Sequence, residues 1–239
     1  MPGSKALLQY KVIDISQPIA SATACWAGDT PFSKQITAAI AHGSFFNLTA
    51  FTMSAHVGTH ADAQLHCRGD FDSCSAGAGE LPLEPFVGPA YVIDLAPHKD
   101  AIKPEHINRK LSNLAAVPQR LLFKTSTAVN PYIFADSCAY FDQTLVPYLK
   151  QNNIVLAGID TASVDHAHCQ SLSVHNELID SGVFWIENLD LSDVEEGEYF
   201  LVALPLKLME LEAAPVRAAL LTVQPCLQKD LFVDDEHRR

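Results

Sequence analysis

The stretch His56-Val57-Gly58-Thr59-His60-Ala61-Asp62-Ala63-Gln64-Leu65-His66 decides how this chain is interpreted. It brings three imidazoles and one carboxylate into a short segment. Neutral imidazole nitrogens and carboxylate oxygens hold a catalytic Zn²⁺ or Mn²⁺ while leaving a coordination position open for water. A single histidine is more often a surface or core group, but four ligand-type residues at this density favour a metal site. The stretch therefore predicts a metal-dependent hydrolase.

The spacing of these ligands requires a bend in the backbone. In an extended strand, His56 and His60 share a face, but their Cα atoms are about 13 Å apart, and metal–nitrogen bonds are only about 2 Å long. A helix would bring the two histidines together and swing Asp62 away from them. Gly58 permits the bend, because glycine tolerates positive φ. Residues 45–54 predict a strand before it, which places the motif where that strand ends and breaks into a loop.

The motif resembles the H-x-G-T-H-x-D-x-P-x-H signature of the cyclase-like metal-dependent hydrolase family. The best-known members of this family are bacterial kynurenine formamidases, and isatin hydrolase is a relative. One position departs from the signature: Gln64 stands where the family usually has proline, which removes loop rigidity and no ligand. Further similarity spreads over nearly the whole chain, in segments that read CWAGDTPF (25–32), GIDT (158–161), ALPLK (203–207) and APVRA (214–218).

The resemblance implies a complete set of metal ligands, namely His56, His60, Asp62, His175 and Glu187, which would hold one or two divalent ions, Zn or Mn, per subunit. The residues alone say less about the last two. His175 lies in a helical pattern over 171–181 that Gly182 would stop, and Glu187 follows an apolar strand pattern over 183–186. A helix-surface histidine and a strand-end glutamate in solvent are the alternatives.

Two further roles come from the resemblance. The family position of His66 is the proton donor and acceptor, a role that suits a side chain titrating near pH 7; a further ligand or an outer contact is the alternative. Trp26 matches a substrate-contacting position. It stands beside a turn over 28–31, and its indole face suits an aromatic substrate. Packing in the core or at the rim is the other interpretation of Trp26.

The resulting hypothesis is hydrolysis of an aryl formamide, N-formyl-L-kynurenine, to L-kynurenine and formate in tryptophan degradation. Isatin hydrolysis, or opening of another cyclic amide or lactone, is the alternative within the family, because Gln64 and residues 165–173 depart from the kynurenine formamidase pattern. A non-catalytic metal-binding homologue is the alternative from another class. The sequence has no G-x-S-x-G or G-x-G-x-x-G motif, which disfavours serine-hydrolase and dinucleotide chemistry.

Composition narrows the partners and the location. The 239 residues are 48% hydrophobic and suit a single domain over 1–239. A net charge of −12 disfavours nucleic acid and anionic membranes as partners. The family resemblance implies a small aromatic amide as the partner. The six cysteines (25, 67, 74, 138, 169 and 226) form no C-x-x-C pair, and the chain has no secretory h-region and no long apolar span. We therefore expect a cytoplasmic protein with reduced thiols.

The patterns predict a mixed α/β fold, with strands over 91–95, 121–125, 154–159, 199–206 and 218–223 and helices over 103–114 and 141–151. The resemblance implies a swivelling β/β/α arrangement around a barrel-like mixed sheet, in a homodimer or higher homo-oligomer. The small-residue loop 69–79 is interpreted as a lid or an inert connection. His166 and His168 are expected on a solvated loop that is close enough to reach a pocket.

Overall fold

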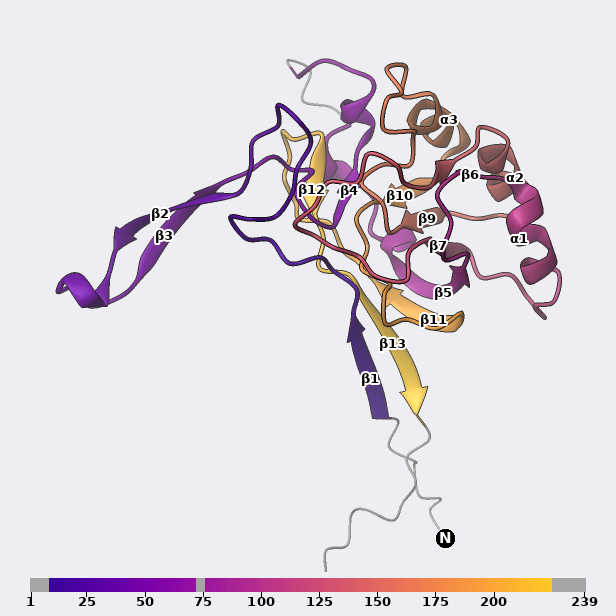
Figure 1. Cartoon of the computed structure of the whole chain (residues 1–239), viewed down its shortest axis with the longest axis horizontal. Helices are drawn as coiled ribbons and strands as arrows, with labels where there is room; N and C mark the ends of the chain where they lie inside the picture. Colours follow the sequence, from indigo (N-terminus) through magenta and orange to yellow (C-terminus); the bar gives the residue numbers. More distant parts are fainter. Residues whose placement is uncertain (1–8, 72–75, 225–239) are drawn as a thin grey trace, which may run out of the picture.

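The computed structural model describes residues 9–71 and 76–224 (Figure 1). Its centre is a seven-stranded sheet in the order β1-β13-β11-β5-β7-β9-β10. These strands are β1 (Gln9–Asp14), β5 (Val87–Asp94), β7 (Arg120–Lys124), β9 (Leu156–Ile159), β10 (Phe184–Ile186), β11 (Gly197–Val202) and β13 (Ala219–Gln224). Neighbours are antiparallel from β1 to β5 and parallel from β5 to β10. The sheet is therefore mixed.

The predicted mixed α/β class is confirmed. Within the described ranges, the strand order has β1 at one edge and β10 at the other. A barrel-like closure is not shown, and the swivelling arrangement and the single domain over 1–239 stay predictions.

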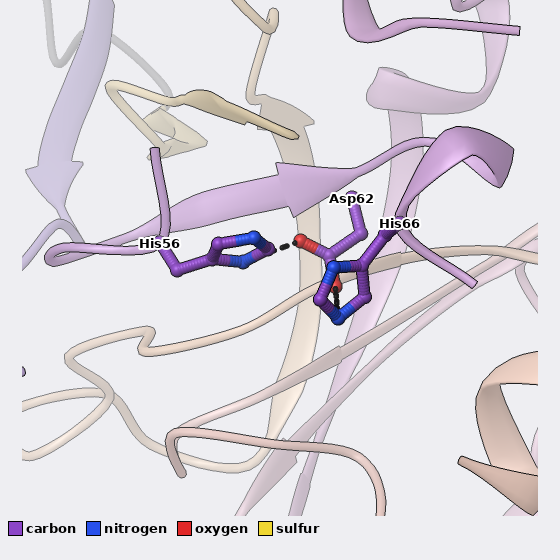
Figure 2. A group of neighbouring side chains, drawn as sticks. All are labelled: His56, Asp62 and His66. Carbon is purple, nitrogen blue, oxygen red and sulfur yellow. Dashed lines mark ion pairs between the residues drawn. The ribbon is translucent and has the colours of Figure 1, made fainter. Parts of the chain in front are cut away.

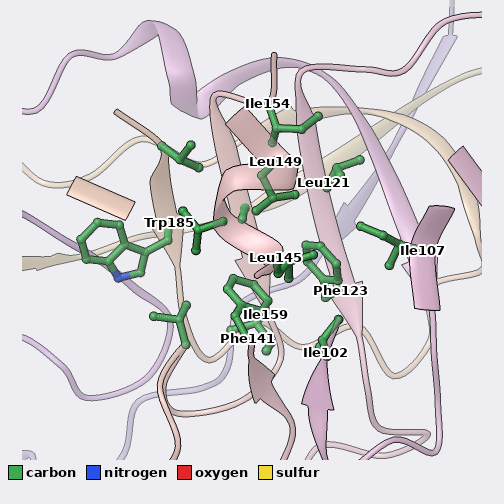
Figure 3. Packing of buried hydrophobic residues seen from close by; sticks show 14 of the residues in the cluster. Ile102, Ile107, Leu121, Phe123, Phe141, Leu145, Leu149, Ile154, Ile159 and Trp185 are labelled. Carbon is green, nitrogen blue, oxygen red and sulfur yellow. The ribbon is translucent and has the colours of Figure 1, made fainter. Parts of the chain in front are cut away.

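Three helices pack near the parallel strands: α1 (Pro104–Leu111), α2 (Leu145–Gln151) and α3 (Ser173–Ser181). Their apolar side chains meet those of β7, β9 and β10 in one core cluster, drawn in Figure 3. All five residues of β7 are buried, as expected of a strand covered on both faces. Leu122 belongs to a second cluster on the other side of the sheet, with Phe86 and Leu156.

The predicted elements differ from the observed ones mainly at their ends. Helix α2 starts at Leu145 because Phe141 belongs to the short strand β8 (Tyr140–Phe141), which pairs with β6 (Ala101–Ile102). Pro147 falls in the first turn of α2, where a missing N–H does no harm. The prediction over 199–206 was too long, since β11 ends at Val202. Helix α3 stops as predicted at Gly182, which has φ +67°.

A hairpin arm of β2 (Ser33–Ala38) and β3 (Leu48–Thr52) projects from the body of the molecule (Figure 1). Of the strand predicted over 45–54, only 48–52 form a strand, because 45–47 lie in the connection between β2 and β3. Phe45 is fully exposed, and five other large apolar residues of the arm are exposed too: Ile36, Ile40, Phe46, Leu48 and Phe51.

Residues 72–75 of the predicted 69–79 loop lie outside the described residues, and so do Cys74 and Cys226. The four described cysteines, at 25, 67, 138 and 169, are free. None of the helices in the described ranges has the length and apolar character that a membrane crossing needs.

Candidate active site

The backbone of the 56–66 motif turns sharply and then forms a short strand. Gly58 has φ +72°, and a Cβ atom there would lie 2.8 Å from Ile19 Cγ1, so both the conformation and the space require glycine. Thr59 Oγ1 accepts the Gln17 N–H at 2.8 Å and donates to the Asn188 carbonyl at 2.6 Å. The next residues form β4 (His60–Asp62), paired with β12 (Ala213–Pro215). The expected loop is therefore a turn followed by a strand.

Three atoms of the motif converge on one point. Figure 2 shows the Asp62 carboxylate at this point, with one oxygen facing His56 and the other facing His66. His56 Nδ1 lies 3.1 Å from Asp62 Oδ1, His60 Nε2 lies 3.3 Å from the same oxygen, and the two nitrogens are 3.1 Å apart. Asp62 Oδ1 is buried and makes no hydrogen bond. Ligand atoms set tetrahedrally around zinc at bond lengths of 2.0–2.1 Å are about 3.3 Å apart. The two nitrogens and the unsatisfied oxygen thus fit a divalent metal ion.

His175 on α3 and Glu187 after β10 complete the cluster. His175 Nε2 lies 3.3 Å from Glu187 Oε1 and 3.5 Å from Asp62 Oδ2, while Glu187 Oε2 lies 3.3 Å from His60 Nε2. Both side chains are buried, so the solvent-exposed alternatives for this pair are wrong. Each carboxylate presents one oxygen to His60 and the other to His175. The five predicted ligands therefore meet, and their coordination of a metal stays a prediction.

The second ring nitrogen of each histidine in the cluster faces an acceptor. His60 Nδ1 lies 2.9 Å from the Gly58 carbonyl, His175 Nδ1 lies 2.7 Å from Asp165 Oδ2, and His56 Nε2 lies 3.4 Å from Glu212 Oε1. An acceptor in this position holds the proton on the outer nitrogen and leaves the inner lone pair free for a metal. The sequence did not reveal Asp165 or Glu212, because their spacing from the histidines has no recognisable pattern.

Replacing Asp165 with asparagine should weaken metal binding about 10- to 100-fold, the usual effect of losing a carboxylate behind a metal-bound histidine. The affinity for Zn²⁺ in competition with a chromogenic chelator measures this. Asp180→Asn, an exposed change on α3, the helix that carries His175, is the control and should bind Zn²⁺ like the unchanged protein. An unaltered affinity in Asp165→Asn would show that the carboxylate does not support His175.

The charges of the cluster favour a bound cation. Burial lowers the pKa of His56 and of His60, but the neighbouring carboxylates outweigh it and raise these values to about 9 and about 10. Burial raises the pKa of Asp62, and the histidines around it hold that value well below the usual range. The carboxylates therefore stay ionised, and the imidazoles hold protons that a bound metal would displace.

His66 stands at the edge of the cluster, in the 3-10 turn Gln64–His66 that follows β4. Its Nε2 atom is 3.9 Å from Asp62 Oδ2, and a quarter of the side chain is exposed. Burial lowers the pKa of His66, so its imidazole is neutral near pH 7. A neutral imidazole with access to the cavity can accept and return a proton. This geometry suits the predicted proton-transfer role, which stays a prediction.

Two cavities meet at Trp26 and His56. The smaller, about 370 Å³, reaches His66 and four carboxylates, those of Asp29, Asp165, Glu187 and Glu212. The larger, about 410 Å³, extends toward residues 97–99 and 125–131. The Trp26 ring packs edge-on against Phe134, with centroids 4.6 Å apart, so it both packs and lines the cavities. His166 and His168 are exposed on a loop, as expected, and His166 lines the smaller cavity.

The family model for cyclases matches residues 13–166. This chain belongs to the cyclase family. The matched region includes the whole 56–66 motif and ends before His175 and Glu187. This chain is 40% identical to the kynurenine formamidase of Polaromonas naphthalenivorans over 210 residues, which is 88% of this chain and 90% of that protein. It is 37% identical to the kynurenine formamidase of Bacillus cytotoxicus over 206 residues, 86% of this chain and 95% of that one.

Solved structures share the fold of this cyclase-family chain. A predicted metal-dependent hydrolase from Bacillus stearothermophilus has a TM-score of 0.73 and 29% identity, with 89% of this chain and 98% of that one covered. Isatin hydrolase A from Labrenzia aggregata has a TM-score of 0.76 and 24% identity, with coverages of 90% and 94%. The relatives confirm the expected enzyme class, an amidohydrolase acting on C–N bonds other than peptide bonds.

Proposed function

We propose that this enzyme hydrolyses an aryl formamide, N-formyl-L-kynurenine, to L-kynurenine and formate. The observation that carries the proposal is the convergence of three histidines and two carboxylates beside a cavity that also contains His66 and Trp26. Similarity to kynurenine formamidases over most of the chain supports the substrate. Isatin, a cyclic amide, is the second candidate substrate.

The ligands would be His56, His60, Asp62, His175 and Glu187, holding Zn or Mn. Asp62 and Glu187 each present one carboxylate oxygen to His60 and the other to His175. This arrangement is compatible with one ion or with two. A bound metal ion would supply an activated water and polarise the formyl carbonyl.

The other residues act on the substrate itself. Hydrolysis breaks the bond between the formyl carbon and the aryl nitrogen, joins the water oxygen to that carbon, and requires a proton for the departing amine. His66 can take the proton from the attacking water and pass it to the nitrogen. The Trp26 face can hold the aryl ring beside the reacting bond. These two residues therefore divide proton transfer and orientation between them.

The test is metal analysis combined with turnover of N-formyl-L-kynurenine and isatin, with and without chelator. We expect bound Zn or Mn, deformylation, and loss of that activity when the metal is removed. Chelator-insensitive turnover of metal-free protein would contradict the metal requirement. Isatin opening without deformylation would move the enzyme to the second substrate, and metal content without any hydrolysis would favour a binding protein.

A homodimer, or a higher homo-oligomer, is part of the proposal. The arm exposes six large apolar side chains, more than an isolated two-stranded hairpin keeps favourably in water. Light scattering on the purified protein should give at least twice the chain mass, and Phe45→Ser with Phe51→Ser should shift it toward one chain. Val12→Ser, at a strand residue as exposed as Phe51, is the control. A monomeric unchanged protein would refute the dimer.

Location in the cytoplasm stays a prediction.

A further inference from the structure

The larger cavity has a positively charged residue, Lys99, in its wall. It begins at His56 and Trp26 and is also lined by Pro97, His98 and Lys99. Lys99 is the one lysine or arginine among the described residues that line this cavity or the smaller one beside it. Within the described ranges, no carboxylate oxygen lies within ion-pair distance of its ammonium group. This charge is therefore free to pair with a ligand.

The two cavities differ in how they treat an anion. Four carboxylates line the smaller cavity. Three of them, Asp165, Glu187 and Glu212, face histidines of the cluster, and Asp29 adds a fourth negative charge that an entering anion would meet. The larger cavity is lined by a single carboxylate, that of Asp160. Asp160 accepts hydrogen bonds from the Thr125 N–H at 2.8 Å, the Thr125 hydroxyl at 2.5 Å and the Ser126 N–H at 3.0 Å. Its charge is engaged by these donors. The larger cavity is thus the one with fewer carboxylates to repel an anion.

His98 adds a second polar group beside Lys99. Its Nε2 atom is buried and has no hydrogen-bond partner, although buried polar atoms are nearly always paired. The His98 backbone N–H donates to the Thr125 carbonyl at 2.9 Å, which fixes this loop to the end of β7. The bond holds His98 and its neighbour Lys99 beside the residues after β7 that line the same cavity.

We propose that the larger cavity binds the carboxylate end of the substrate and that Lys99 pairs with this carboxylate. The inference rests on the proposed function, because it takes the substrate to be an aryl formamide that carries a carboxylate. The formamide then lies at His56 and the aromatic ring near Trp26 and Phe134, both of which line this cavity. The carboxylate occupies the end lined by Lys99. Lys99 is thereby a specificity residue that binds substrate without touching the reacting bond.

The test compares ligands that differ only in the carboxylate. L-Kynurenine and kynuramine, its decarboxylated analogue, are titrated calorimetrically into metal-loaded enzyme, and the corresponding formamides are assayed for turnover. In Lys99→Met, the Kd for kynurenine and the KM for N-formylkynurenine should rise about tenfold, since each lost charge-assisted contact weakens binding on this scale. Kynuramine binding and the kcat for both formamides should stay within about twofold. Lys99→Arg should restore most of the preference.

Lys150→Met, an exposed lysine on α2, is the control with the same change in net charge and should alter neither ligand. Equal weakening of kynurenine and kynuramine in Lys99→Met, or no weakening of either, would overturn the proposal. The binding arm separates this result from failure of the proposed function. An enzyme that does not deformylate either substrate, but loses its preference for kynurenine in Lys99→Met, would still have this carboxylate site.

Discussion

Replacing Asp62 with asparagine is expected to remove the bound metal and to lower kcat/KM by at least about 1,000-fold, equivalent to about 4 kcal/mol of transition-state stabilisation. The Asp62 carboxylate is the shared centre of the cluster. Its Oδ1 faces His56 and His60, and its Oδ2 faces His175 and accepts the indole N–H of Trp185 at 3.2 Å. Asparagine keeps the shape but removes the charge and turns one acceptor into a donor, which a cation cannot use.

Metal content by elemental analysis and turnover of N-formyl-L-kynurenine measure this effect together. Asp193→Asn, at an exposed position, is the matched control and should keep both the metal and the activity. Circular dichroism of Asp62→Asn should retain the native spectrum, because the change leaves the packing around β4 intact. Full metal occupancy with full activity in Asp62→Asn would refute the assignment of this carboxylate as a ligand.

Local patterns were enough to find the parallel part of the sheet. The apolar runs of β5, β7 and β9 are buried on both faces, so the sequence marks them without knowledge of their neighbours. The hairpin arm could not be predicted this way. Its residue Phe45 is as apolar as a core residue and yet fully exposed. Whether such a side chain is covered depends on partners that the sequence pattern does not contain.

The candidate site divides in the same manner. His56, His60 and Asp62 lie close in sequence, and one turn at Gly58 brings them together, so their spacing predicts a ligand cluster. His175 and Glu187 reach the cluster only through the packing of α3 and the β10 edge, and resemblance to the family was needed to select them. Asp165, Glu212 and Lys99 were missed altogether. Each acts through a contact in space, and single charged residues are too common in a sequence to stand out.

Replacing His66 with asparagine is expected to lower kcat by about 100- to 10,000-fold, the usual contribution of a positioned general acid–base group, while the metal remains bound. His66 Nε2 is 3.9 Å from the nearer Asp62 oxygen, farther than the 3.1–3.5 Å that separates the five proposed ligands. It faces a cavity and has a neutral imidazole near pH 7. The loss should therefore fall on kcat, with little change in KM.

Metal analysis decides between this role and the alternative, because His66 lies close enough to His56 and Asp62 to share an ion with them. A proton-transfer residue leaves the metal content of His66→Asn unchanged and makes the residual rate respond to added imidazole. A ligand takes the metal with it when it is removed. His166→Asn, an exposed histidine lining the same cavity, is the control and should lose little activity. Metal loss in His66→Asn would assign this histidine to the metal site and leave the proton transfer to another group.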